Sequence, residues 1–437
     1  MTTPRPYQTQ AVADCRAAFV AGAQAVLLQL PTGAGKTFVA GMVVEESEAR
    51  GLRVLVLAQR RELVTQLASR LPGPVGVVMA GCKGHPAARV QVGSVDTINA
   101  REVPKDIGLI LIDEAHHATC ESIRNIIEAC PGAYILGLTA TPQRADGAAM
   151  GDVFDTLVTG PSIRDLMTLG VLVECDVVAA SPGRSLARDP VEGWLEFAGD
   201  RPGFIFAPTI PDSKRWCLGL LQNGINAAHI DGGTPHRERD EIIHHFRSGA
   251  IDVLSSVYIF TEGFDAPRAE VCMLARGCGN PGTFLQMVGR VLRSSPGKER
   301  ALLIDLKGVV HEHGLPSDDR VWSLEGTASR LSKPGIALTQ CPQCGAVWRS
   351  GERRICFRCE WEMPPPKSPA VVRREMELIE QKRLRRELEV EQNKKRLHPA
   401  SELARLKMEA KMKGHHIKWV GVKYRHLFGE WPKGLYR

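Results

Sequence analysis

The sequence predicts two tandem α/β domains, each built on a parallel β-sheet, followed by a cysteine-rich segment and a basic helical tail. Two successive series of short apolar runs alternate with longer amphipathic stretches, and 437 residues are too many for one compact core. Four cysteines and a proline-rich stretch then separate these domains from a Lys- and Glu-rich end. We place the divisions at residues 1–165, 166–330, 338–362, 363–372 (the proline-rich linker) and 373–437.

The apolar runs have the length and composition of buried strands. The first series is Ala25–Leu30, Val54–Ala58, Val90–Val95, Leu109–Asp113 and Ile135–Leu138. The second series is Gly203–Ala207, Ala227–Ile230, Val253–Ser256, Val271–Leu274 and Ala301–Ile304. Because a longer polar or amphipathic stretch follows each run, we expect βαβ units, with the join between the two domains at Gly160–Leu172.

The bulk composition excludes a membrane partner and a secreted disulfide scaffold. The contents of 43% hydrophobic and 24% charged residues are those of an ordinary globular protein. No apolar run approaches the roughly 18 residues that suggest a membrane span. The first ten residues lack the basic-then-apolar layout of a signal peptide, so we expect a cytoplasmic protein.

Positive charge is concentrated in the last sixth of the chain. From Lys367 to Arg437 there are 19 Lys and Arg against 9 Asp and Glu, a net charge of +10. Because the whole chain carries +7, the preceding residues carry −3. This asymmetry predicts a polyanionic partner near the carboxyl-terminal end.

A glycine-rich turn between an apolar strand and a helix has the composition of a phosphate cradle. Glycines let backbone N–H groups turn toward a phosphate, a lysine reaches the β- and γ-phosphates, a hydroxyl binds Mg²⁺, and the helix N-terminus favours negative charge. A chance glycine turn is the alternative. The candidate ATP-binding residues are Pro31, Thr32, Gly33, Ala34, Gly35, Lys36 and Thr37, although Leu30 stands where the usual motif has its first glycine.

A carboxylate pair follows the apolar strand Leu109–Ile112 directly. Beside a phosphate cradle, Asp113 is suited to bind Mg²⁺ together with Thr37. Glu114 is suited to orient the attacking water. The alternative is a solvated acidic turn.

Together these residues resemble superfamily 2 helicases with a DEAH-type second motif, over roughly residues 4–310. The resemblance implies two tandem RecA-like domains that hydrolyse ATP between them. It also implies that Gln8 contacts the adenine, and that His116 bridges Glu114 to Gln286 or Thr139. For His116, capping the next helix is the alternative.

The remaining helicase motifs occur in the expected order. The resemblance implies that Arg60, Arg61, Thr97 and Thr261 contact nucleic acid, mostly at its sugar-phosphate backbone, and that Gly263 and Asp265 belong to the nucleotide site. Any one of these arginines alone could be an ordinary surface charge. The matching segments are Ala58–Leu63, Gly93–Thr97, Thr139–Pro142, Ile205–Thr209, Thr261–Asp265 and Gln286–Arg293.

The role of the last of these motifs also follows from the chemistry of phosphoryl transfer. Phosphoryl transfer concentrates negative charge, and an arginine supplied from outside the phosphate cradle contributes roughly 10³–10⁵ in rate. If Arg290 and Arg293 come from the second domain, hydrolysis requires closure of the cleft. Gln286, Arg290 and Arg293 are spaced i, i+4 and i+7, which predicts one helical face aimed at the nucleotide or, alternatively, a solvated stripe.

Two Cys-x-x-Cys pairs, separated by eleven residues, have the spacing of a metal site. Cys341, Cys344, Cys356 and Cys359 suit a structural, tetrahedral Zn²⁺. An Fe–S cluster is the alternative, and two disulfides do not suit a reducing compartment. Nearby basic and aromatic side chains favour a role in strand or fork binding; for Trp348 and Trp361, packing in the core of the small segment is an equal alternative.

The basic end is expected to be helical. The composition of Arg373–Lys413 predicts a long charged helix that is broken at His398-Pro399. This helix would serve as a phosphate-binding arm or as a solvated strut. The segment His415–Trp431 resembles the tail of RadD-like and phage-type members of the helicase group. A protein partner of this tail is left open.

The function expected from these features is an ATP-dependent DNA helicase or translocase acting in repair, recombination or replication. Single-stranded or forked DNA is the expected substrate, and RNA is the main rival. Two further functions stay open, namely an ATP-gated clamp that does not unwind and the motor subunit of a nuclease system. The expected cofactors are ATP, Mg²⁺ and Zn²⁺.

Overall fold

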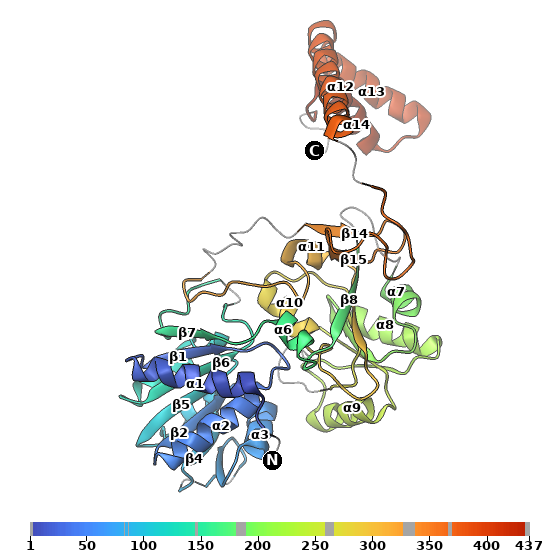
Figure 1. Ribbon diagram of the computed structural model, residues 1–437. Coiled ribbons are helices and arrows are strands. Elements are labelled where there is room, and N and C mark those ends of the chain that lie inside the picture. Colours follow the sequence, from blue (N-terminus) through green and yellow to red (C-terminus); the bar gives the residue numbers. More distant parts are fainter. Residues whose placement is uncertain are drawn as a thin grey trace. The chain divides into compact units, whose positions relative to one another are not determined.

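The computed structural model describes residues 3–82, 84–85, 87–144, 147–180, 189–257, 266–326, 337–365 and 369–432. The chain divides into two compact units, Met1–Glu362 and Met363–Arg437. The first unit contains both predicted sheets and the cysteine-rich segment, and the second contains the helical end (Figure 1).

The first sheet has seven strands in the order β3-β4-β2-β5-β6-β1-β7, and all its pairings are parallel (Figure 1, blue to green). Its strands are β1 (Ala25–Gln29), β2 (Arg53–Ala58), β3 (Val75–Val78), β4 (Val90–Ser94), β5 (Ile107–Asp113), β6 (Tyr134–Thr139) and β7 (Thr156–Thr159). Its helices are α1 (Pro6–Val20), α2 (Lys36–Ala49), α3 (Arg61–Arg70), α4 (Val95–Asn99), η1 (Ala115–His117) and α5 (Glu121–Glu128).

Side chains alternate between the two faces of this sheet along each strand. Because both faces are apolar, helices cover both of them. Val54 and Val56 of β2 lie in a core with α1, α2 and α3, whereas Leu55 and Leu57 lie in a second core with α4 and α5. The first core continues without a break into the second sheet, where it includes Phe204. Apolar burial therefore joins the two sheets.

The second sheet has six parallel strands in the order β10-β11-β9-β12-β13-β8. Its strands are β8 (Glu174–Ala179), β9 (Gly203–Phe206), β10 (Ala227–His229), β11 (Val253–Ser256), β12 (Val271–Leu274) and β13 (Arg300–Asp305). The helices that follow the first sheet are α6 (Ile163–Thr168), α7 (Pro190–Phe197), α8 (Ile210–Gln222), α9 (His236–Ser248), α10 (Pro281–Val288) and α11 (Val309–His313). Two tandem parallel α/β domains are thus confirmed, and β3, β7 and β8 were not anticipated.

The cysteine-rich segment contains a small antiparallel hairpin of β14 (Leu338–Gln340) and β15 (Val347–Arg349). The second unit consists of α12 (Pro369–Arg396), α13 (Pro399–Lys413) and α14 (Ile417–Phe428). The predicted break at His398-Pro399 is present between α12 and α13. Within the described ranges, no helix combines the length and apolarity needed to cross a bilayer.

Candidate nucleotide site and metal centre

Three neighbouring strands of the first sheet bring the candidate nucleotide residues together. β1 pairs with β6 and β6 pairs with β5, so that the chain segments leaving their carboxyl ends are adjacent. These ends carry the glycine loop after Gln29, the residue Thr139, and the pair Asp113 and Glu114. Ligands of open parallel sheets collect at this edge.

The glycine loop has backbone angles and close contacts that only glycine allows. Gly33 and Gly35 have φ angles of +88° and +89°, which other residues rarely adopt. A Cβ on Gly35 would lie 2.6 Å from Nε2 of Gln8, and one on Gly33 would lie 2.8 Å from Cδ2 of Leu172. Within the part of the chain that the structure describes, no side chain caps the helix that begins at Lys36, so its first N–H groups are available to an anion.

Gln8 and Tyr7 fix this loop from α1. Nε2 of Gln8 donates to the carbonyl of Ala34 at 3.1 Å, and the Tyr7 hydroxyl donates to the same oxygen at 2.7 Å. The Arg5 N–H donates to Oε1 of Gln8 at 3.0 Å. These contacts place Gln8 at the loop, and its expected contact with adenine stays a prediction.

The charges in the loop are arranged for a phosphate and a cation. Burial lowers the pKa of Lys36, while Glu114 and Asp113 oppose that shift. Burial, followed by the charge of Glu114, raises the pKa of Asp113 to about 6. A bound Mg²⁺ would favour the ionised carboxylate again, so Asp113 and the Thr37 hydroxyl are oxygen donors that fit the ion.

Glu114 and His116 form the start of a polar path toward the second domain. Oε2 of Glu114 is buried with no hydrogen-bond partner in the described structure, and it lies 3.6 Å from Nδ1 of His116. The same nitrogen lies 3.3 Å from Oγ1 of Thr139, which accepts from the Thr141 N–H at 3.1 Å. Glu114 also has a φ of +50°, and such strain in a residue other than glycine is common at functional sites.

The second domain reaches the glycine loop through a turn that follows α10. A Cβ on Gly289 would lie 2.6 Å from Cβ of Thr32, so the absence of a side chain lets the backbone pack directly on the loop. Arg290 is only 5% exposed. Cγ of Arg293 lies 3.2 Å from the position of a Cβ on Gly33. Burial, followed by Arg70, lowers the pKa of Arg293 to about 10, and Glu114 opposes this shift.

The expectation of one helical face for this motif is wrong. α10 ends at Val288, so Gln286 lies in the helix whereas Arg290 and Arg293 lie in the turn beyond it. Arg293 then forms an isolated antiparallel bridge with Leu172. The arginines reach the loop because of this turn, not because of the i, i+4, i+7 spacing.

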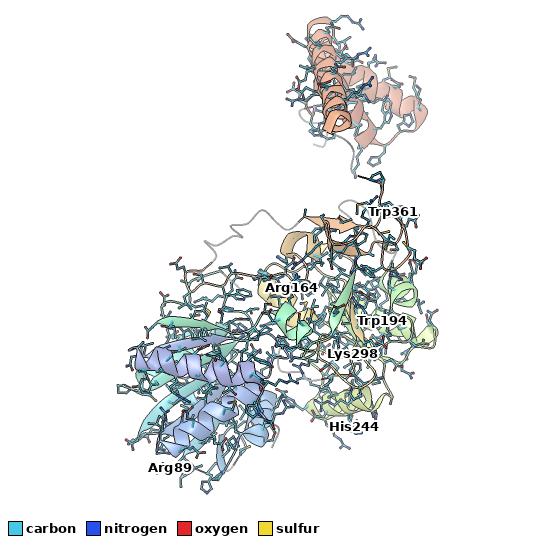
Figure 2. The ribbon with its side chains drawn as sticks, in the orientation of Figure 1. Arg89, Arg164, Trp194, His244, Lys298 and Trp361 are labelled. Carbon is cyan, nitrogen blue, oxygen red and sulfur yellow. The ribbon has the colours of Figure 1, made fainter. Side chains whose placement is uncertain are left out.

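Lys298 is a residue of this site that the motifs did not indicate. It is 7% exposed and labelled inside the second domain in Figure 2. Its ammonium donates to the carbonyls of Ala269 at 2.6 Å, Arg293 at 2.8 Å and Pro267 at 3.3 Å. Burial lowers its pKa to about 8, which leaves it charged at pH 7. Lys298 therefore ties the backbone of Arg293 to the turn at Ala266–Ala269.

A strap of residues 315–326 makes an unexpected connection between the domains. The N–H groups of Met150 and Gly151 donate to the carbonyl of Leu324 at 2.8 and 3.1 Å. Arg320 holds the other end by donating to the carbonyls of His313 and Leu315. The strap borders a cavity of about 340 Å³ whose walls include Thr32 of the glycine loop. Its sequence mixes polar and apolar residues and carries no periodicity that would have predicted these contacts.

The candidate nucleic-acid residues occupy the ends of two other adjacent strands. Arg60 and Arg61 follow β2 and are exposed, and Thr97 lies in α4 after β4. Beside them, Nη1 of Arg239 in α9 lies 3.3 Å from Oε1 of Glu62 in α3, an ion pair between the domains. The remaining candidates, Thr261, Gly263 and Asp265, lie outside the described residues.

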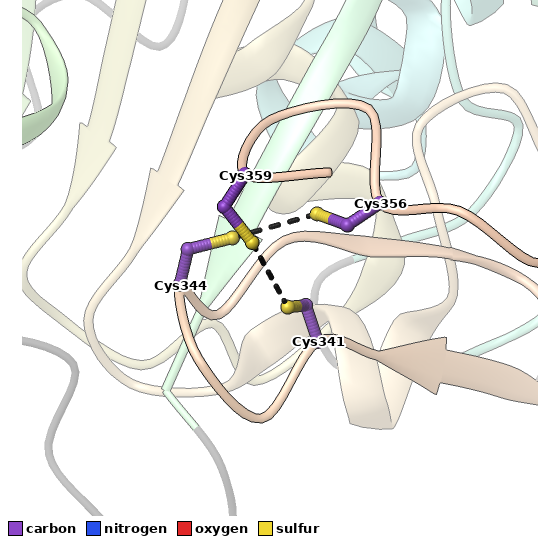
Figure 3. A group of neighbouring side chains, drawn as sticks. All are labelled: Cys341, Cys344, Cys356 and Cys359. Carbon is purple, nitrogen blue, oxygen red and sulfur yellow. Dashed lines mark hydrogen bonds between the residues drawn. The ribbon is translucent and has the colours of Figure 1, made fainter. Parts of the chain in front are cut away.

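The four clustered cysteines converge as expected for a metal centre (Figure 3). Their sulfur atoms all lie within 4.8 Å of one another, with Cys341 to Cys359 at 3.5 Å and Cys344 to Cys356 at 3.6 Å. Four thiolates around Zn²⁺ at about 2.3 Å would be roughly 3.8 Å apart, so the arrangement fits this ion. The distances exceed those of disulfide bonds.

The cysteine-rich segment is fastened to the second sheet. The Ala179 N–H at the end of β8 donates to the carbonyl of Gly345 at 2.9 Å. Nε of Arg349 donates to Asp318 of the strap at 2.7 Å, and the Arg358 guanidinium stacks 4.2 Å from the ring centre of Phe197. Trp348 is buried and belongs to the segment's own core, whereas Trp361 is partly exposed.

Two family models match the chain. Residues 1–144 match the family described as type III restriction enzyme, res subunit, and residues 192–295 match the helicase conserved C-terminal domain. A 51.5 kDa protein of a Lactococcus phage is 27% identical, over 82% of this chain and 83% of its own. The DNA 3'-5' translocase XPB2 of Sulfurisphaera tokodaii is 26% identical, over 64% of this chain and 77% of its own. The chain spans only 57% and 51% of the irc3 relatives of Schizosaccharomyces pombe and Saccharomyces cerevisiae.

Solved structures share the fold. A fragment assigned as an HsdR subunit of a type I restriction enzyme from Vibrio vulnificus superposes with a TM-score of 0.59 at 20% identity, over 72% of this chain and 66% of its own. The restriction-modification enzyme LlaBIII, bound to DNA, gives 0.55 at 17% identity, over 70% and 28%. Dbp5 of S. cerevisiae, bound to RNA, gives 0.52 at 16% identity, over 71% and 86%.

The contacts of Lys298 give a direct test of how Arg293 is positioned. In Lys298→Met, one buried and two partly buried carbonyls lose a charged donor, which should destabilise the fold by roughly 2–3 kcal/mol. We expect ATP turnover to fall at least about tenfold through misplacement of Arg293, a loss of transition-state stabilisation of about 1.4 kcal/mol. Steady-state kinetics and thermal unfolding would measure both effects. The matched control is exposed Lys105→Met, and a Lys298 variant that behaves like this control would contradict the role.

Proposed function

Because this chain belongs to superfamily 2 of the helicases and is an ATP hydrolase of that class, we propose that it is a DNA-dependent translocase that unwinds DNA. The observation that supports this most is the packing of Gly289 and Arg293 against the glycine loop. An arginine delivered by one domain to the phosphates held by the other makes hydrolysis depend on domain closure. Closure and reopening are the steps that can move a bound strand.

We assign the roles within the cleft from the geometry. The N–H groups of the loop and Lys36 bind the β- and γ-phosphates, and Thr37 with Asp113 would hold Mg²⁺, which neutralises phosphate charge when bound. Glu114, whose buried Oε2 has no hydrogen-bond partner in the described structure, orients the attacking water. Arg290 and Arg293 stabilise the charge that develops on the γ-phosphate.

DNA is favoured over RNA as the substrate. XPB2 is named as a DNA translocase, and LlaBIII was solved bound to DNA. Dbp5 shares the fold and was solved bound to RNA, so the fold alone does not decide. The exposed cations Arg60 and Arg61 would hold the strand through its phosphates, and such binding is sequence-tolerant and salt-sensitive. We place the activity in DNA repair, recombination or replication.

A motor subunit of a nuclease system is the second candidate. The match of residues 1–144 to a restriction-enzyme subunit and the likeness to an HsdR fragment favour it. In that case the chain would move DNA for a partner that cuts it.

The substrate is tested by measuring ATP turnover in parallel with single-stranded DNA, duplex DNA, forked DNA and RNA. We expect single-stranded and forked DNA to stimulate turnover most, and forked DNA to be separated into strands in a single-turnover assay. Lys36→Ala and Glu114→Gln should both abolish turnover, the second while ATP still binds. Stimulation by RNA alone would overturn the DNA assignment. Stimulation by duplex DNA without strand separation would favour the nuclease motor.

We further propose that Cys341, Cys344, Cys356 and Cys359 bind a structural Zn²⁺ that organises the cysteine-rich segment for nucleic-acid binding. Metal removal should release the contacts of the segment with β8 and the strap, because apo thiols do not hold such a fold. We expect Cys356→Ser, or chelation, to lower DNA affinity more than basal ATP turnover. Metal content, DNA binding and turnover would be measured together.

The matched control for the metal site is Cys120→Ser, because Cys120 is an exposed thiol outside the cluster. Unchanged DNA affinity in Cys356→Ser, with the metal lost, would show that the centre serves stability alone.

A further inference from the structure

The helical second unit has one face whose cations form no ion pair with any residue that the structure describes. α14 packs against both α12 and α13, and its buried residues include Val420, Tyr424 and Phe428. The segment from His415 to Phe428 contains three Lys and Arg, three His and no acidic residue. Lys418, Lys423 and Arg425 are all exposed.

In the other two helices of the unit, acidic residues accompany the cations. In α12, Arg383 and Arg385 lie 3.0 and 3.7 Å from the glutamates one turn away. In α13, Arg405 is paired with both Glu402 and Glu409. These cations are thus largely satisfied within their own helices.

By contrast, Lys418, Lys423 and Arg425 form no ion pair with a carboxylate of the residues described. Lys423 contributes to lowering the pKa of Glu409, but the hydrogen bond from Lys413 is the largest cause, and Glu409 is already paired with Lys413 at 2.7 Å. α12 contains nine Lys and Arg with six Glu, and α14 contains three Lys and Arg with no acidic residue, so each carries a net charge of +3 and the charge is densest on the shorter α14.

Aromatic rings are interleaved with these cations. The ammonium of Lys423 lies 5.7 Å from the ring centre of Trp419, and the guanidinium of Arg425 lies 5.1 Å from that of Trp431. His415 stacks on Trp419 at 4.7 Å, and Trp431 is 48% exposed. Cations that grip phosphates, next to rings on which bases stack, form the combination that binds single-stranded nucleic acid without sequence preference.

We propose that the exposed face of α14, with Lys418, Lys423, Arg425, Trp419 and Trp431, is a second binding surface for single-stranded DNA, separate from the strand ends of the two sheets. This inference rests on the proposed function for its choice of DNA. It gives the motor a contact that does not depend on the nucleotide state, because the surface lies in a unit with its own core. Such a contact would keep the protein bound to the DNA while the cleft opens.

The test compares two full-length variants with the same loss of charge. The first carries Lys418→Gln, Lys423→Gln and Arg425→Gln. The control carries Arg383→Gln, Arg385→Gln and Arg405→Gln, which removes cations that already have carboxylate partners. Affinity for a single-stranded oligonucleotide is measured without nucleotide over a range of salt concentrations.

We expect the slope of log affinity against log salt to fall by about 2 in the α14 variant, since each phosphate contact contributes roughly 0.7. Over a fourfold change in salt, that corresponds to a roughly 15- to 20-fold smaller loss of affinity than in the wild type. The control should retain most of the wild-type slope. A charge-preserving variant, with Lys418→Arg, Lys423→Arg and Arg425→Lys, should restore it and thus exclude misfolding.

Equal slopes in the α14 variant and its control would overturn the proposal, as would binding of acidic lipid vesicles in place of DNA. Basal ATP turnover should be unchanged in all three variants. The outcome is separate from that of the proposed function, because wild-type protein that binds DNA without DNA-stimulated turnover would refute the motor and leave this surface standing.

Discussion

The chemistry that we propose for this protein depends on one close contact, in which the turn at Gly289 of the second domain packs on the glycine loop of the first. A side chain on Gly289 would collide with Thr32, and a side chain on Gly33 would crowd the turn that carries Arg293. The absence of two Cβ atoms therefore allows Arg293 to approach the place where phosphates would bind. The same contact lies within an apolar core that runs from one sheet into the other, so that burial supports the closed arrangement.

The closed cleft buries charged side chains, and a bound nucleotide would offset the free-energy cost of burying them. Lys36 and Arg293 have lowered pKa values and Asp113 a raised one, and burial is the largest cause in all three. A phosphate group bound to Mg²⁺ would give each of them an opposite charge. A bound nucleotide would therefore favour the closed cleft further, and this is how we propose that binding and hydrolysis are coupled to domain movement. Lys298 and the strap add backbone connections that hold the arginine turn and limit how the domains separate.

Much of the fold followed from local sequence, because buried parallel strands are continuous apolar runs and glycine turns have fixed chemistry. Strands β7 and β8 were not predicted, because Thr156–Thr159 and Glu174–Ala179 are edge strands that contain polar residues. Motif and context predicted that the glycine loop and the pair Asp113 and Glu114 would lie together, and the structure places them at the ends of neighbouring strands, while their roles stay predictions. Lys298 could not be predicted, because its burial arises only when the turn at Ala266–Ala269 and the turn that carries Arg293 fold against it. The helical face expected for Arg290 failed because α10 stops at Val288, a boundary that helical periodicity alone does not reveal.

The most direct measurement is the ATP turnover of Arg293→Ala beside its affinity for ATP. If the second domain completes the site, turnover should fall by roughly 10³-fold, the lower end of what such arginines contribute, while ATP binding to the loop changes little. Turnover within a few-fold of wild type, at saturating ATP and DNA, would contradict the account.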